Sequence, residues 1–158
     1  MSTITPELYV RVQSFFEEYG RLLDEDRLET WVELFTEDAR YEIVSRENHE
    51  QGLPLSLMLC DSRDMLHDRI YSLREANIYN IHTDCHVIGT ARILHENGVL
   101  SAVAPYSLFQ STQEGETRLF SVGRYHLTFA ETGGRLSISR LRVVTDTGAI
   151  LTLLATPI

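Results

Sequence analysis

The most reactive arrangement in the sequence is a short histidine and aspartate motif in the middle of the chain. His82-Thr83-Asp84 matches the first half of a two-histidine, one-carboxylate iron triad, and His126 is a conceivable third ligand. In an extended strand His82 and Asp84 lie on the same face, so the spacing permits shared coordination. Such three-residue motifs are common by chance. We therefore expect His82 and His86 to be strand-entry residues that bond to the backbone or to a partner chain.

The absence of lysine and the placement of the two cysteines limit the kinds of catalysis that this chain could perform. The sequence contains no lysine, and all 14 basic residues are arginine. This excludes a Schiff-base lysine, a P-loop lysine and a lysine general base. Cys60 and Cys85 form no close pair in sequence, and we expect both to be reduced, buried thiols.

Composition limits the class of protein. With 158 residues, 43% of them hydrophobic, the chain is expected to form one globular domain over residues 1–158. The net charge of −9 opposes binding to nucleic acid or to an anionic membrane. The longest apolar runs are too short to span a bilayer, and the first residues lack the pattern of a secretion signal. We expect a cytoplasmic protein.

The N-terminal part of the sequence predicts two helices that could position the candidate histidine and aspartate residues. Thr5-Pro6-Glu7 is a typical helix start, with a capping hydroxyl, an early proline and an acid that faces the helix dipole. The apolar residues after it recur at spacings of three and four: Leu8, Val12, Phe15, Phe16, Tyr19, Leu22 and Leu23. Asp24-Glu25-Asp26 interrupts this helix. Asp26 followed by Glu29 resembles a capping box, which would open a short helix with four inward residues: Leu28, Trp31, Val32 and Phe35.

The middle of the chain predicts a strand and a third helix. Residues 39–45 alternate as in a strand, with Tyr41 and Ile43 on one face. Residues 46–60 are irregular because Gly52 and Pro54 interrupt them. Asp61-Ser62 then caps a helix that runs to about Glu75, with a stripe formed by Leu66, Ile70 and Leu73.

The second half predicts an antiparallel meander. Four long strands are expected at about 81–94, 99–112, 116–131 and 135–147, joined by turns rich in glycine. In the third of these strands, Leu119 has the same parity as Tyr125, Leu127 and Phe129. In the last strand Leu136 and Ile138 have one parity, whereas Leu141 and Val143 have the other. A β-bulge near Ser139-Arg140 would explain this change. The overall prediction is an α+β fold in which a curved sheet surrounds the helices.

Several segments resemble a known family. Residues 22–31 and 34–41 resemble the opening of the NTF2-like (cystatin-like), cone-shaped α+β superfamily. More specifically, residues 61–66 (DSRDML), 68–70 (DRI) and 74–79 (REANIY) resemble the small (β) subunit of bacterial aromatic-ring-hydroxylating dioxygenases. Cys85-His86-Val87-Ile88-Gly89 stands at the expected strand entry. The resemblance extends over nearly the whole chain and is closest to small subunits that serve aromatic acids, as in terephthalate dioxygenase and salicylate 5-hydroxylase.

This resemblance implies an assembly of three large and three small subunits, a three-plus-three hexamer. In it the large subunit holds a Rieske [2Fe–2S] centre and a mononuclear Fe(II), and the small subunit is structural. No catalytic, cofactor-binding or metal-binding residue is then expected on this chain. A Rieske centre needs two cysteines and two histidines. Cys60 has no histidine two residues later and Cys85 is followed directly by His86, so neither half of the ligand motif is present.

An alternative also comes from the superfamily. Its stand-alone dehydratases and isomerases enclose a pocket with a histidine, tyrosines and an aspartate, and Tyr41, His86 and Asp38 could form such a set. A neutral histidine can transfer a proton and a buried tyrosine hydroxyl can polarise a carbonyl. In the structural interpretation, Tyr41 fills the cone and His86 satisfies a hydrogen bond at a strand end.

The strand at 99–112 also predicts assembly, because it carries apolar residues on both parities. Val99, Val103 and Phe109 lie on one face, whereas five residues lie on the other: Leu100, Ala102, Ala104, Tyr106 and Leu108. One face can fill the cone, and the other needs a cover. Residues 150–154 (ILTLL) add further apolar surface. We expect a trimer that uses the outer sheet surface, with more surface left for the large subunit.

Overall fold

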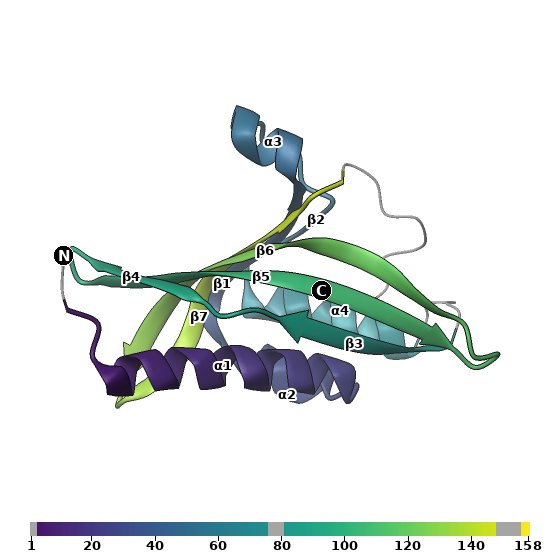
Figure 1. The fold of residues 1–158 in the computed structure, drawn as a ribbon, viewed down its shortest axis with the longest axis horizontal. Helices are drawn as coiled ribbons and strands as arrows, with labels where there is room; N and C mark the ends of the chain where they lie inside the picture. Colours follow the sequence, from purple (N-terminus) through teal and green to yellow (C-terminus); the bar gives the residue numbers. More distant parts are fainter. Residues whose placement is uncertain (1–2, 76–80, 148–155) are drawn as a thin grey trace.

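The structure, a computed structural model, describes residues 3–75, 81–147 and 156–158. The predicted α+β architecture is confirmed: a long, curved sheet bends around helices that pack against one of its faces (Figure 1). In chain order the elements are α1 (Pro6–Asp24), α2 (Leu28–Val32), β1 (Phe35–Ser45), α3 (Arg46–Gln51), β2 (Met58–Cys60), α4 (Arg63–Glu75), β3 (His82–Ile88), β4 (Arg92–Glu96), β5 (Val99–Thr112), β6 (Thr117–Thr132) and β7 (Arg135–Thr145).

Two of the predicted helices begin directly after the capping residues that the sequence indicated. The Thr5 hydroxyl accepts a hydrogen bond from the Leu8 N–H at 3.2 Å, and Pro6 is the first residue of α1. The Met65 N–H donates to the Ser62 hydroxyl, also at 3.2 Å, at the start of α4. The apolar faces of both helices are buried against the sheet. No helix within the described ranges is long and apolar enough to cross a membrane.

The capping box predicted at the start of α2 is wrong. The helix begins at Leu28, and no side chain caps it. Asp26 and Glu29 instead bind Arg74 of α4, at 2.6 Å from Nη1 to Oδ2 and 2.9 Å from Nε to Oε1. A guanidinium from a distant helix competes for both carboxylates, and a charge-assisted contact is stronger than the local cap.

The sheet has the order β2-β1-β7-β6-β5-β3, and β4 pairs with β5 beyond the end of β3. The β1–β7 pair is parallel, and the other pairs are antiparallel. The single strand predicted at 81–94 is in fact two strands, β3 and β4. They separate at Gly89, where the Gly89 N–H donates to the Pro105 carbonyl at 2.8 Å and a Cβ would lie 2.7 Å from the proline ring. Pro105 cannot donate to a neighbouring strand, which interrupts the ladder at this position.

The predicted β-bulge in the last strand is confirmed. Thr128 pairs with Arg140 but Phe129 pairs with Ile138, so Ser139 is the extra residue. The apolar residues on both sides of it are therefore buried. A second bulge at Phe120 was not predicted, and it turns Leu119 outward to 50% exposure instead of onto the face of Tyr125. Both bulges increase the bend of the sheet.

The inner face of the sheet and the helices enclose an aromatic core. The ring of Trp31 lies 4.9 Å from that of Phe35 and 5.7 Å from that of Tyr41 between centroids. Tyr125 stacks on Tyr106 at 4.5 Å and also contacts Tyr19. The interior of the cone is thus filled mainly by the protein's own aromatic rings, which leaves less space there for a ligand.

Candidate functional site

The structure does not bring the three residues of the iron motif together. His82 and Asp84 lie on the inner face of β3, with Nε2 and Oδ1 3.4 Å apart. His126 lies on β6 opposite Val103 and faces outward, on the other side of the sheet. The residues of the described ranges contain no group of three or more histidine, cysteine, aspartate or glutamate side chains that could hold a metal ion.

The two cysteines are also far apart. Cys60 lies on β2 and Cys85 on β3, at opposite edges of the sheet. Cys60 is buried as predicted, and burial raises the pKa of its thiol. Cys85 is exposed, contrary to the prediction, because its position on β3 faces outward opposite Phe109. These two residues could not share one Rieske cluster.

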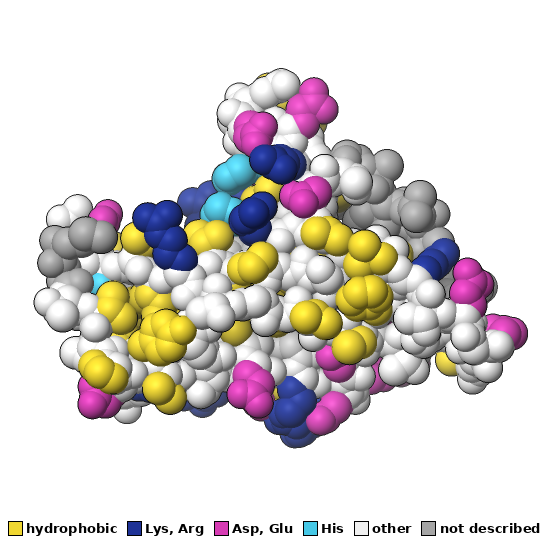
Figure 2. All heavy atoms as spheres, viewed as in Figure 1, with side chains coloured by type: hydrophobic (Ala, Val, Ile, Leu, Met, Phe, Trp, Pro, Cys, Tyr) yellow, Lys and Arg dark blue, Asp and Glu magenta, His cyan; other side chains and the backbone are white. Residues whose placement is uncertain are grey.

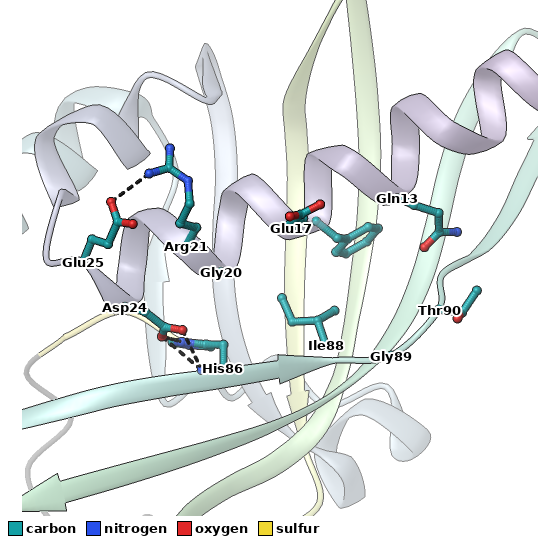
Figure 3. Close-up of a pocket in the computed structure, with 11 residues that line it drawn as sticks. Gln13, Glu17, Gly20, Arg21, Asp24, Glu25, His86, Ile88, Gly89 and Thr90 are labelled. Atoms are coloured by element: carbon teal, nitrogen blue, oxygen red, sulfur yellow. Dashed lines mark hydrogen bonds and ion pairs between the residues drawn. The ribbon is translucent and has the colours of Figure 1, made fainter.

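His86 has a partner that the sequence did not reveal. Its Nδ1 lies 2.5 Å from Oδ1 of Asp24, and its backbone N–H donates to both carboxylate oxygens of Asp24 at 3.0 Å. The His86 side chain is 0% exposed. Asp24 is the last residue of α1, so this carboxylate fastens the end of the helix to strand β3 (Figure 3). The prediction that His86 satisfies a hydrogen bond is confirmed, but the partner of its ring is the Asp24 carboxylate instead of the backbone or a partner chain, and His86 lies within β3 instead of at its end.

This pair lies beside a hollow of about 440 Å³ between α1 and β3, and most of the polar side chains near it are already engaged. Arg21 binds Glu18 on its own helix and Glu25 at the helix C-cap. The amide of Gln13 donates to the Ala91 carbonyl and accepts from the Ala91 N–H, both at 3.0 Å. Figure 3 shows Gln13 and Arg21 on α1, above β3. Their bonds connect parts of this chain and mainly hold the helix on the sheet.

Tyr41 lies elsewhere, deep in the cone, and its hydroxyl is occupied. The Ile158 N–H donates to it at 3.1 Å, and the hydroxyl lies 3.2 Å from the Ile158 carbonyl oxygen. Tyr19 donates to the same carbonyl at 2.7 Å. Ile158 is 0% exposed. Burial raises the pKa of Tyr41, which keeps the phenol protonated.

The acid–base set of the alternative is therefore not assembled. Asp38 is exposed on β1, where it accepts a hydrogen bond from the Thr36 hydroxyl at 3.0 Å. Asp38 shares the outward parity of the exposed Arg40, whereas Tyr41 has the parity of the buried Ala39. His86 borders the hollow of about 440 Å³ under α1, and Tyr41 is not among the residues that line this hollow.

A curved sheet around helices, with an aromatic interior, defines the class of fold, and comparison with known proteins identifies it. Residues 6–142 match the SnoaL-like domain. The chain belongs to the SnoaL-like family, within which its relatives are small subunits of aromatic-ring dioxygenases. This confirms the cone-shaped fold and the family resemblance that the sequence predicted.

Three relatives illustrate this. The chain is 43% identical over 137 residues to the anthranilate 1,2-dioxygenase small subunit of Burkholderia cepacia, covering 86% of this chain and 85% of the relative. It is 34% identical over 150 residues to subunit beta 2 of the terephthalate 1,2-dioxygenase terminal oxygenase component of Comamonas sp., covering 94% and 97%. A crystal structure from Novosphingobium aromaticivorans, assigned as the β subunit of an aromatic-ring-hydroxylating dioxygenase, superimposes with a TM-score of 0.89 at 41% identity, covering 99% and 100%.

Proposed function

We propose that this chain is the small, structural subunit of the oxygenase component of a multicomponent aromatic-ring-hydroxylating dioxygenase. It would act, as a single domain in the cytoplasm, in the catabolism of an aromatic acid of the anthranilate, terephthalate or salicylate kind. The names of its relatives support the substrate class. No residue of this chain is proposed to take part in catalysis or to bind a cofactor or metal.

The observation that carries the structural role is the occupied interior of the cone. Enzyme pockets of ordinary size are concave, and their polar groups converge on a ligand. Here the hydroxyls of Tyr19 and Tyr41 converge on the main chain of Ile158, which is fully buried. A ligand that hydrogen-bonds to the Tyr41 hydroxyl would have to compete with the main chain of Ile158 for it.

In this proposal the Rieske centre and the mononuclear Fe(II) belong to the large subunit. The wide separation of Cys60 and Cys85 supports this division, and so does the placement of His126 on the outer face, away from His82 and Asp84. The partner is the large (α) subunit, with three copies of each chain in the hexamer. The net charge of −9 is consistent with neither nucleic acid nor a membrane as partner.

The outer face of the sheet supports assembly. Val87, Leu119 and Val122 are between 36% and 55% exposed on β3 and β6, and Phe109 lies between these strands on β5. Figure 2 shows hydrophobic side chains gathered over this face. A continuous apolar patch of this kind marks an interaction surface.

Reconstitution tests the proposed function. The chain is purified alone and together with the proposed large subunit, and iron and aromatic-acid turnover are measured in both preparations. We expect no stoichiometric iron in the isolated chain, and turnover per iron only in the complex. An iron-to-chain ratio near one that is lost in His82→Ala or Asp84→Ala would show that this chain carries a metal site, and the proposal would be wrong.

A further inference from the structure

The outer face of the sheet carries a second feature, a cationic hollow beneath α3. It has a volume of about 340 Å³, and its walls come from α3 and four strands: His49, Leu94, Val103, His126, Arg140 and Arg142. Figure 2 shows arginine and histidine side chains together at this position, next to the hydrophobic side chains of the same face. The hollow lies on the opposite side of the sheet from the aromatic core.

The charge at this hollow is unusual for so acidic a chain: Arg140 and Arg142 line it, and Glu42 and Arg40 lie beside them on the same face. The carboxylate of Glu42 is 4% exposed and lies 2.8 Å from Nε of Arg142 and 3.6 Å from Nη2 of both Arg40 and Arg140. Three guanidinium groups thus surround one carboxylate, and two positive charges are not neutralised within the cluster. Arg40 and Arg140 are 44% and 52% exposed, so their remaining N–H groups are accessible. Guanidinium groups of this kind bind carboxylates from a partner with well-defined geometry.

Carboxylates suited to this hollow stand at the tip of the β5–β6 hairpin, which projects at the end of the molecule (Figure 1). Glu114 and Glu116 are exposed there and form no ion pair with another described residue. The hairpin is closed just below its tip, since the Thr112 N–H donates to the Glu116 carbonyl at 2.8 Å and the Ser111 and Thr117 hydroxyls are 2.8 Å apart. A closed hairpin loses little conformational entropy when it binds.

We propose that the hairpin tip of one copy binds in the cationic hollow of the next copy, with Glu114 and Glu116 facing Arg40 and Arg140. The inference rests on the proposed self-association and names the surfaces that form it. Two negative charges meet two unneutralised positive ones. Because hairpin and hollow are different surfaces of the same chain, the contact is heterologous and can close a three-membered ring.

The neighbouring apolar residues fit the same contact. Phe109, Leu119 and Val122 lie near the base of the hairpin, on the face that also carries the hollow. A second copy that receives the hairpin would approach this part of the sheet and cover it. Charge pairing would then fix the register, and apolar burial would supply most of the binding energy.

A charge-swap series tests the contact. The variants are Glu114→Arg with Glu116→Arg, Arg140→Glu, and the three changes combined in one chain. Glu96→Arg, at the exposed end of β4, is the matched control. Arg140→Gln serves as a second variant, because it removes the charge without placing an acid beside Glu42. Self-association is measured by sedimentation over a range of concentrations, and folding by circular dichroism.

We expect the hairpin reversal and Arg140→Glu each to raise the dissociation constant of self-association on the order of a hundredfold, because like charges then face each other. The combined variant should recover part of this loss, because one introduced arginine then faces an introduced glutamate while the unchanged Arg40 still faces the other. Arg140→Gln should weaken association less, and Glu96→Arg not at all. If the folded reversals associate like the wild type, the hairpin–hollow contact is wrong while the proposed self-association stands. If the wild type itself does not associate, the proposed trimer fails together with this contact.

Discussion

His86 shows how one carboxylate joins two distant parts of the chain. Asp24, 62 residues earlier, accepts hydrogen bonds from the backbone N–H of His86 and pairs with its ring. The ring is fully buried, while Asp24 remains 27% exposed at the end of α1. Because the carboxylate ties a helix end to strand β3, we interpret the pair as a structural fastening.

His86→Ala should therefore lower the unfolding free energy of the chain without lowering the turnover of the assembled oxygenase. Loss of the buried ring and its contact with Asp24 should cost about 2–3 kcal/mol of unfolding free energy. His67→Ala is the matched control, since His67 is 44% exposed and lies 3.3 Å from Glu33 on the surface, and it should change stability by less than about 0.5 kcal/mol. Denaturant unfolding measures both variants. Assembled oxygenase that retains the His86→Ala subunit should keep most of its turnover per iron, and a hundredfold loss of turnover with normal assembly would indicate acid–base chemistry instead.

His126 predicts a pH dependence of stability. Burial lowers its pKa, and so do the neighbouring His49, Arg142 and Arg124. Because the unfolded chain then takes up a proton more readily than the folded one, stability falls as the pH drops below about 6.5, by at most about 1.4 kcal/mol per pH unit.

The comparison of unfolding free energies between about pH 5 and pH 8 tests this effect, since the unfolded histidine titrates inside that range. His126→Gln should flatten the acid slope, whereas His67→Gln, at the exposed position on α4, should leave it unchanged. An identical slope in wild type and His126→Gln would contradict the prediction.

At the scale of elements, the strands of the bent sheet approach one another very closely at certain points. Gly123 in β6 is one of them: a Cβ built there would lie 2.0 Å from the Val144 carbonyl oxygen of β7. No side chain fits without separating the two strands. Gly98, in the β4–β5 turn, differs because its φ is +76° but nothing lies within 4 Å of its Cβ position.

Alanine substitutions at these two glycines therefore distinguish the stability cost of a steric clash from the cost of an unfavourable backbone conformation. Gly123→Ala should cost about 3 kcal/mol or more, because the backbone of β7 must move. Gly98→Ala should cost only about 1 kcal/mol, the usual penalty for a left-handed conformation. Thermal unfolding of both variants provides the measurement. Equal losses would mean that β6 and β7 can separate at Gly123 without penalty.

Local patterns predicted much of this architecture, but not all of it. The parity change around Ser139 is visible in the sequence because apolar residues flank it on both sides. The bulge at Phe120 is not, since Leu119 and Phe120 are both apolar and either could face inward. The break at Gly89 depends on Pro105 of another strand, and the role of Arg74 depends on the carboxylates of Asp26, before α2, and Glu29, within α2. Such tertiary contacts leave little local trace.

The candidate site was predictable to a similar degree. The hydrogen-bonding role of His86 was expected, but its partner Asp24 looked only like the end of a helix. Tyr41 was expected in the cone, and its bond to Ile158 joins residues 117 positions apart. The apolar segment at 150–154, expected to add to the assembly surface, lies outside the described residues.

For the whole molecule, a filled interior and an exposed outer face place the interactions on the outside. The two faces of β5 differ clearly in their solvent exposure. Leu108, on the inner face, is 2% exposed, so a charge there would disrupt the core rather than test assembly. Val87 and Val122 are 55% and 36% exposed on the outer face, beside Phe109, and are the appropriate positions.

Val122→Glu and Val87→Glu should therefore weaken self-association while the chain stays folded. An isolated wild-type chain should show about three times its 18.1 kDa mass by light scattering at micromolar concentration. Each variant should shift toward the single-chain mass, because a carboxylate in the apolar part of an interface loses its hydration without gaining a partner. Val10→Glu, at a 60% exposed position on α1 away from this face, is the matched control and should keep the wild-type mass. A strict wild-type monomer, or variants that assemble as the control does, would mean that the outer face of the sheet is not the surface that joins the copies.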